Sequence, residues 1–196
     1  MTRFPPFQGP TLYTAVEGDD GDGFSAWLAL REAHVDFREC VVDLSPPRRD
    51  LTAARLGRLS PAAAPPVLVD GGYVVFDALA IMEYANDVGA VQLLPGEPLR
   101  RAEARAMLAW QRKAEPARLL LAWQAALAAS DGPYLYGPLS LADLAIAPRL
   151  PGLIANHPPL DSFGAVRAWA ERLSRRAAVR EWLVRRARGA TPIASS

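Results

Sequence analysis

Few of the side chains that carry out covalent or metal chemistry occur in this sequence of 196 residues. Cys40 is the only cysteine, which excludes an intramolecular disulfide, a Cys-x-x-Cys redox pair and a cysteine-based metal cage. His34 and His157 are the only histidines, and their separation argues against a zinc site of the usual ligand types. Neither histidine fits a Ser-His-Asp motif. We therefore expect no metal and no histidine-based catalysis.

Ser140 and Asp143 form the most regular polar pair in the chain. They have the spacing of a helix capping box, with Asp in place of the usual Glu or Gln. In such a box the serine accepts from an N–H of the first turn, and the acidic residue accepts from the serine N–H. Because free N–H groups inside a domain are costly, this pair predicts a structural helix cap rather than a catalytic site.

The two halves of the chain carry opposite charge. Residues 1–98 hold 7 basic and 14 acidic side chains, a net −7, and residues 99–196 hold 15 and 7, a net +8. This division predicts two regions that dock with electrostatic help. The basic excess is concentrated at Arg167, Arg172, Arg175, Arg176, Arg180, Arg185, Arg186 and Arg188. Without an aromatic platform or a nucleic-acid motif, it indicates a solvated helix face and no nucleic-acid partner.

No segment suggests a membrane or an export signal. The longest strongly apolar stretch, residues 119–129, is interrupted by Gln124 and is shorter than the ~20 residues of a membrane helix. Residues 1–10 lack the apolar core of a signal peptide. We expect a cytoplasmic protein without membrane contact.

The first half alternates short β-type runs with amphipathic helical patterns. An acidic turn-rich loop at 17–23 follows the first expected strand, and a Gly-rich turn at 70–72 separates two strands of a hairpin. The expected strands are 11–16, 36–44, 67–69 and 73–76, and the expected helices begin near Phe24, Asp50 and Asp77. The order β-α-β-α-β-β-α is that of a thioredoxin-like domain.

The second half shows helical patterns and no convincing strand. Helices are expected at 99–114, from Glu115-Pro116 to about Ser130, and from Ser140 towards Ala155, with Pro148 and Pro151 as kink or stop points. Two Arg-rich amphipathic helices follow. The expected organisation is a thioredoxin-like domain at 10–88, a linker at 89–98, an all-helical domain at 99–188 and a disordered tail at 189–196.

Three stretches of sequence resemble the cytosolic glutathione S-transferase family. Residues 27–33 (WLALREA) resemble the family's first helix. Residues 65–70 (PPVLVD) with 76–84 (FDALAIMEY) are similar to its "V-P-V-L, then E-S-x-A-I-x-x-Y" signature, and 134–143 (YLYGPLSLAD) to "F-L-x-G-x-x-S-x-A-D". The resemblance covers nearly the whole chain. It implies glutathione as ligand or co-substrate, a homodimer, and a hydrophobic pocket for a small electrophile.

The resemblance also implies a ligand site that has lost hydrogen-bonding groups. It places a cis peptide bond before Pro66, and a residue at Pro65 whose backbone pairs with the cysteinyl part of glutathione; proline has no N–H to donate. The acidic-Ser pair that holds the γ-glutamyl group becomes Asp77-Ala78, so the hydroxyl is missing. Each lost hydrogen bond to a charged ligand costs roughly 1.5–3 kcal/mol.

The residue that would activate the thiol is also in question. The resemblance implies a Ser, Cys or Tyr just before the first helix, and that position falls near Asp20. An aspartate there would raise the pKa of a bound thiol. Ser25 and Tyr13 are weaker alternatives. Trp110 and Lys113 are the candidates for the electrophile pocket, where Trp123 also occurs, although a tryptophan at helical spacing is more often core.

Two functions remain open on the sequence alone. One is a glutathione S-transferase-like protein that binds glutathione, or a related acidic thiol, beside a hydrophobic pocket and conjugates it to a small electrophile. The alternative is a non-catalytic binding or scaffold protein with the same fold that has lost thiolate activation. Whether the protein is an enzyme therefore depends on the site and not on the fold.

Overall fold

The N-terminal half contains four strands and three helices in the expected order. The computed structural model describes residues 8–15, 21–150, 152 and 162–187. The elements are β1 (Thr11–Ala15), α1 (Asp22–Glu32), β2 (Arg38–Val42), α2 (Pro46–Leu56), β3 (Val67–Asp70), β4 (Tyr73–Val75) and α3 (Ala78–Val88). The thioredoxin-like prediction is confirmed.

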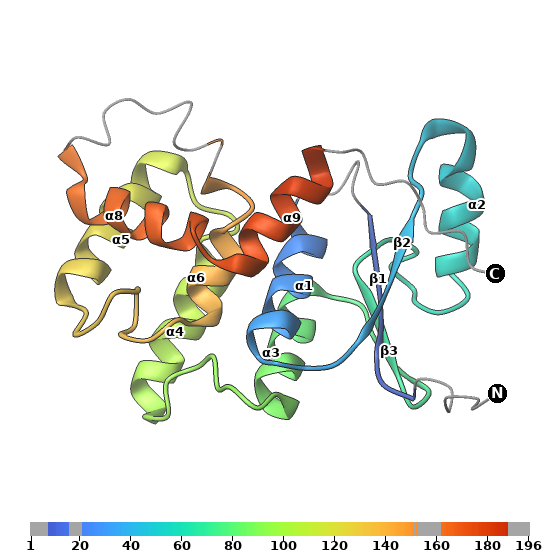
Figure 1. Cartoon of the computed structure of the whole chain (residues 1–196), viewed down its shortest axis with the longest axis horizontal. Coiled ribbons are helices and arrows are strands. Elements are labelled where there is room, and N and C mark those ends of the chain that lie inside the picture. The colour runs from blue at the N-terminus through green and yellow to red at the C-terminus, as the bar shows by residue number, and fades with distance from the viewer. Residues whose placement is uncertain (1–7, 16–20, 151, 153–161, 188–196) are drawn as a thin grey trace.

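The four strands form one mixed sheet in the order β2-β1-β3-β4. β1 pairs in parallel with β2 and antiparallel with β3, and β3 and β4 form a hairpin. Gly71 and Gly72 make its two-residue turn with φ of 52° and 90°, a region that glycine adopts without steric cost. α2 covers one face of the sheet, whereas α1 and α3 lie between the sheet and the remaining helices (Figure 1).

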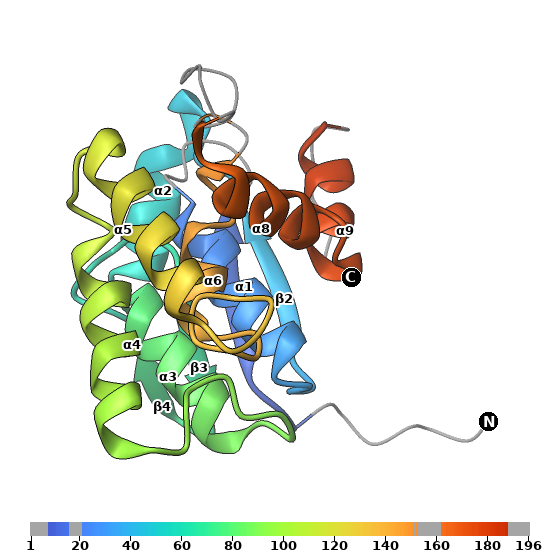
Figure 2. The ribbon, with the colours of Figure 1, turned by 90° about the vertical axis from the view of Figure 1, so that its left-hand side faces the viewer.

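Helices make up the described part of the second half. They are α4 (Pro98–Trp110), α5 (Pro116–Ala129), α6 (Leu141–Ile146), α8 (Gly164–Ser174) and α9 (Ala177–Ala187). Figure 2 views these helices from the side away from the sheet, with α4 and α5 on one side and α8 and α9 on the other. Among the described residues, no helix has the length and apolar character needed to cross a membrane.

Several helix boundaries lie at proline residues, and one of them, the start of α2, differs from the expected position. Prolines occupy the first positions of α2, α4 and α5, where the missing N–H costs nothing. α2 therefore begins at Pro46 and not near Asp50, because Pro46-Pro47 starts the helix instead of separating two elements. α6 ends at Ile146, well before Ala155, two residues ahead of Pro148.

One hydrophobic core joins the two halves. It contains Leu12, Trp27, Leu28, Leu68 and Ile81 of the first half together with Leu108, Leu141, Leu144, Val179 and Trp182 of the second. Trp182 of α9 stacks on Phe24 of α1 with ring centroids 4.8 Å apart. A second core around Trp123 and Trp169 lies within the helical half. The halves therefore pack as one unit.

The predicted electrostatic docking is visible as ion pairs between the halves. Arg176 pairs with Glu32, Arg185 pairs with Glu39 at 2.8 Å, and Arg105 pairs with Glu83 at 2.6 Å. Arg176 and Arg185 are about one-third exposed, so for these two arginines the expectation of a simply solvated helix face is wrong. Asp20, His157 and residues 189–196 lie outside the described residues.

Candidate functional site

Two segments lie at the end of the sheet where β1 and β4 finish and β3 begins, here called the edge of the sheet. Tyr13, in the middle of β1, pairs with Val67 at the start of β3, and Val75 at the end of β4 pairs with Leu68. This register places the Pro65–Pro66 segment, which precedes β3, and the start of α3, which follows β4, at the same end of the strands. The Pro65–Pro66 peptide bond is cis. The edge therefore carries the positions that the sequence assigns to a ligand.

The first turn of α3 is capped by Asp77. Its carboxylate accepts from the N–H of Leu79 at 2.8 Å and from the N–H of Ala80 at 3.1 Å. Ala78 is buried, with 2% of its surface exposed. Two of the helix N–H groups that suit an anion are thus occupied by the chain's own carboxylate.

The start of α1 is fixed against α6. The Ser25 hydroxyl is bonded to the carbonyl of Gly21 at 3.1 Å and lies 3.4 Å from that of Ala145, and Ser25 is 4% exposed. Gly21 has φ of 101°, and a Cβ there would lie 2.5 Å from the Cβ of Pro148. These contacts give Ser25 a structural role and argue against it as a nucleophile. Tyr13 lies half-buried in β1, between β2 and β3.

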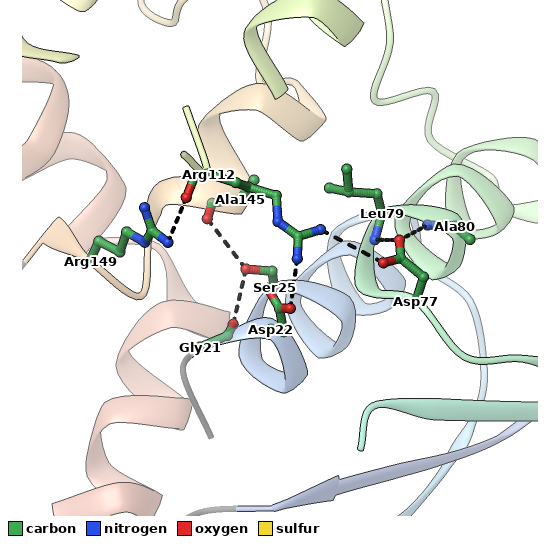
Figure 3. A network of polar contacts seen from close by, with 9 residues as sticks. All are labelled: Gly21, Asp22, Ser25, Asp77, Leu79, Ala80, Arg112, Ala145 and Arg149. Atoms are coloured by element: carbon green, nitrogen blue, oxygen red, sulfur yellow. Dashed lines mark hydrogen bonds and ion pairs between the residues drawn. The ribbon is translucent and has the colours of Figure 1, made fainter. Parts of the chain in front are cut away.

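Arg112, which follows α4, reaches both helix starts. Its Nη2 donates to Oδ2 of Asp22 in the first turn of α1 at 2.8 Å, and its Nη1 lies 3.9 Å from Oδ2 of Asp77 (Figure 3). The Arg112 side chain is 28% exposed. A cation from the helical half thus stands between the two N-termini where the sequence places the ligand.

The backbone that carries Arg112 is held by its neighbours. Arg149 donates to the carbonyls of Gln111 at 3.3 Å and Arg112 at 3.2 Å. Gln111, 1% exposed, donates to the Ala142 carbonyl at 2.8 Å and accepts from Trp123 Nε1 at 3.2 Å. Sequence reasoning missed Arg112 because it belongs to no motif and lies 90 residues from Asp22. The opposite charges of the two halves were the only signal for it.

A cavity of about 720 Å³ lies between α4 and α5. Trp110 lines it, together with Met107, Ala122, Ala126 and Leu135, whereas Lys113 is exposed and is not among the lining residues. Tyr136 also lines it, and burial, with smaller contributions from Glu103 and Asp143, raises the pKa of this phenol to about 12. The cavity suits an apolar ligand, and its phenol stays neutral near pH 7.

Asp143 is the most enclosed carboxylate among the described residues. The Ser140–Asp143 capping box is present at the start of α6, with Asp143 Oδ2 accepting from the Ser140 N–H at 2.8 Å and from its hydroxyl. Oδ1 accepts from the N–H of Leu135 at 3.0 Å and from Nε1 of Trp169 at 2.8 Å. Burial raises the pKa of this carboxyl, and the hydrogen bonds oppose that effect. These contacts are structural.

Metal coordination is not supported within the described ranges. No group of three or more His, Cys, Asp or Glu side chains there could hold a metal ion. The charged side chains that the fold brings together are instead Arg112, Asp22 and Asp77. This set can bind a charged organic ligand.

The sequence is similar to a glutathione S-transferase domain and to a probable isomerase. Residues 24–88 match the family model described as glutathione S-transferase, N-terminal domain. A stretch of 101 residues is 37% identical to the probable maleylacetoacetate isomerase of Caenorhabditis elegans. That match covers 51% of this chain and 45% of the worm protein, so it spans less than half of that relative's length.

Over nearly all of the chain, the structure is similar to solved structures that include a glutathione transferase and a glutathione transferase homologue. Omega 3C from Trametes versicolor gives a TM-score of 0.73 at 20% identity, covering 90% of this chain and 89% of that one. A Burkholderia glutathione transferase homologue with bound glutathione gives 0.69 at 25% identity, covering 92% and 100%. FzlA from C. crescentus gives 0.71 at 25% identity, covering 95% and 96%.

Proposed function

The chain carries a glutathione S-transferase N-terminal domain on a glutathione-transferase fold, and from this premise we propose that it binds glutathione, or a related acidic thiol, where α1 and α3 begin. The observation that carries the proposal is Arg112, which hydrogen-bonds Asp22 in the first turn of α1 and approaches Asp77 at the start of α3, the two helix starts that the resemblance assigns to the ligand. The Burkholderia homologue, which holds glutathione, supports it.

The residues at this edge fit part of such a ligand. The Pro65 carbonyl can accept from a ligand amide, and the N–H of Ala78 belongs to the first turn of α3, where no intrahelical acceptor exists. Arg112 supplies a positive charge towards an anionic group. Two contacts are missing, namely a donor at Pro65 and a hydroxyl at position 78. Binding is therefore expected to be weaker than in a complete site.

The cavity beside Trp110 is proposed to receive the second substrate. Trp110 ends α4 and Arg112 follows two residues later, so the apolar cavity and the charged edge are neighbours along the chain. Bound glutathione supplies a sulfur nucleophile, and the protein contributes its orientation and the environment of its charge. The likeness to a probable maleylacetoacetate isomerase adds glutathione-dependent isomerisation to the reactions worth assaying.

A non-catalytic binding or scaffold protein is the second candidate. It is favoured by the Asp77 carboxylate, which occupies the N–H groups of Leu79 and Ala80 at the helix start where a ligand carboxylate would bind. Titrating glutathione against the fluorescence of the five tryptophans separates the two candidates. Micromolar binding with conjugation of a small electrophile supports the enzyme. Millimolar or absent binding supports the scaffold.

Restoring the hydroxyl in α3 is expected to tighten glutathione binding. Ala78→Ser returns a donor beside the γ-glutamyl position, and one hydrogen bond to a charged ligand corresponds to about 10- to 100-fold in Kd. The matched control is Ala80→Ser, which adds a hydroxyl to an exposed position in the same turn. Kd values from the fluorescence titration that are equal for both variants and the wild type would refute the assignment of position 78.

The proposal includes that the protein is a homodimer and that it acts in the cytoplasm. Glutathione keeps thiols such as that of Cys40 reduced in that compartment. β4 is an edge strand. Tyr73, its first residue, is 81% exposed and Phe76, which follows it, is 45% exposed, and these apolar side chains are available to a second copy.

Charge placed on that surface is expected to dissociate the dimer. The double variant Tyr73→Asp with Phe76→Asp should sediment as a monomer at concentrations where the wild type sediments as a dimer, because buried carboxylates lack partners. Leu51→Asp on α2, an apolar residue that is 68% exposed and lies away from β4 in the sequence, is the control and should leave the mass unchanged. A monomeric wild type would contradict the proposal.

A further inference from the structure

Arg112 stands in a setting where a ligand anion would complete its coordination. Within the described residues, its guanidinium makes one hydrogen bond, to Asp22, and a longer contact of 3.9 Å to Asp77. A guanidinium has five N–H donors, so most of its hydrogen-bonding capacity is not used by these contacts. Figure 3 shows it between the starts of α1 and α3, with its side chain reaching in from the helical half.

We propose that Arg112 is the residue that pairs with the thiolate of the bound ligand. It would take the place of the hydroxyl or thiol that the resemblance puts before the first helix and that this chain lacks near Asp20. The inference rests on the proposed function. The hydrogen bond to Asp22 places the guanidinium on the α1 side of the edge, where the thiol is expected, rather than on the γ-glutamyl side at Asp77.

The chemistry requires a fixed positive charge and no proton acceptor on the protein. The guanidinium of Arg112 supplies this charge, so it stabilises the thiolate electrostatically while the thiol proton passes to solvent. A positive charge within about 4–6 Å lowers the pKa of a thiol by about 1–3 pH units. Arg112 also offsets the carboxylates of Asp22 and Asp77, which would raise that pKa.

Hydrogen bonds from neighbouring residues fix the backbone at Arg112 and so position its side chain. Arg149 donates to the carbonyl of Arg112 itself. The preceding residue, the buried Gln111, is hydrogen-bonded through its side chain to α6 and to Trp123. In the described part of the chain, the charged side chains that contact the guanidinium are Asp22 from α1 and Asp77 before α3, and Arg149 beyond α6 binds the backbone of Arg112. Arg149 is therefore a positioning residue for Arg112.

The test measures the ionisation of the bound thiol rather than turnover. With saturating glutathione, the ultraviolet absorbance of the thiolate is titrated against pH, with S-methylglutathione as the reference that has no thiol. Arg112→Gln is expected to raise the pKa of the bound thiol by about 1–3 pH units, because the cation is lost and two carboxylates remain. Arg112→Lys keeps the charge and should restore most of the difference.

Arg105→Gln is the matched control. Arg105 also bridges the two halves, in a two-pronged ion pair with Glu83, but it does not contact Asp22 or Asp77. A raised pKa of the bound thiol in Arg112→Gln but not in Arg105→Gln supports the inference. If the wild type binds glutathione but the two variants shift this pKa equally or not at all, the inference is overturned while the proposed function stands. A wild type that binds no glutathione overturns the proposed function and this inference together.

Discussion

Asp143→Ala is expected to lower the free energy of unfolding by about 3–5 kcal/mol, because three buried N–H groups lose the acceptor that they share. These are the N–H groups of Ser140 and Leu135 and Nε1 of Trp169, all of which point at a carboxylate that is 0% exposed. This effect is larger than the ~0.5–2 kcal/mol of a simple helix cap, since the carboxylate joins three segments of the helical half.

Chemical denaturation followed by circular dichroism measures this loss. Asp131→Ala is the control, because Asp131 pairs with Arg100 at the surface and is 70% exposed, so its removal should cost less than about 1 kcal/mol. Asp143→Asn should fall between the two, since an amide oxygen in the Oδ1 place still accepts from Leu135 and Trp169. A loss from Asp143→Ala no larger than that from Asp131→Ala would show that the network contributes little.

The expected loss for Asp143→Ala exceeds that for a simple helix cap because the spacing of residues in the sequence predicts only the local contacts of Asp143. Ser140 and Asp143 are three residues apart, so local periodicity predicts their contact. Trp169 lies 26 residues beyond Asp143, and only the packing of α8 against α6 brings its indole to the carboxylate. The structural role of Asp143 was predictable from the sequence, whereas the size of its contribution to stability depends on a long-range contact.

The candidate site likewise contains residues that the sequence predicts and one that it does not. Pro65, Pro66, Asp77 and Ala78 could be placed from motifs, because each lies at a fixed offset from a strand or helix boundary. Arg112 could not, because its partner Asp22 is 90 residues away and an arginine after an alanine-rich helix has no distinctive pattern. The sequence did contain a coarse form of this information, since acidic residues are concentrated in the first half and arginines in the second.

The same limit applies to the boundaries of the helices. Proline has two opposite meanings, as a helix starter and as a helix breaker, and only context separates them. Pro46 and Pro47 begin α2, whereas Pro148 follows the end of α6. The fold class survives such errors because it depends on the order of the elements, while the positions of side chains at a site depend on their boundaries.

Trp182→Ala is the other substitution expected to have a large effect, with a loss of about 3–5 kcal/mol in the free energy of unfolding. The Trp182 ring is 5% exposed, stacks on Phe24 and lies 5.4 Å from the ring of Trp27. The guanidinium of Arg185 lies over Trp182 at 5.6 Å. Removing the indole leaves a cavity at the contact between α9 and α1 and deletes a cation–π partner.

Leu183→Ala is the matched control, because the neighbouring side chain on α9 is 37% exposed and should cost less than about 1 kcal/mol on truncation. Denaturation midpoints of the two variants provide the comparison. Equal midpoints would mean that α9 is not needed to hold the halves together. If Trp182→Ala alone is destabilised, α1 depends on the helical half both at its face, through Trp182, and at its first turn, through Arg112 and Asp22. The geometry of the proposed ligand edge would then be a property of the docked halves, and the thioredoxin-like half alone would lack its cation.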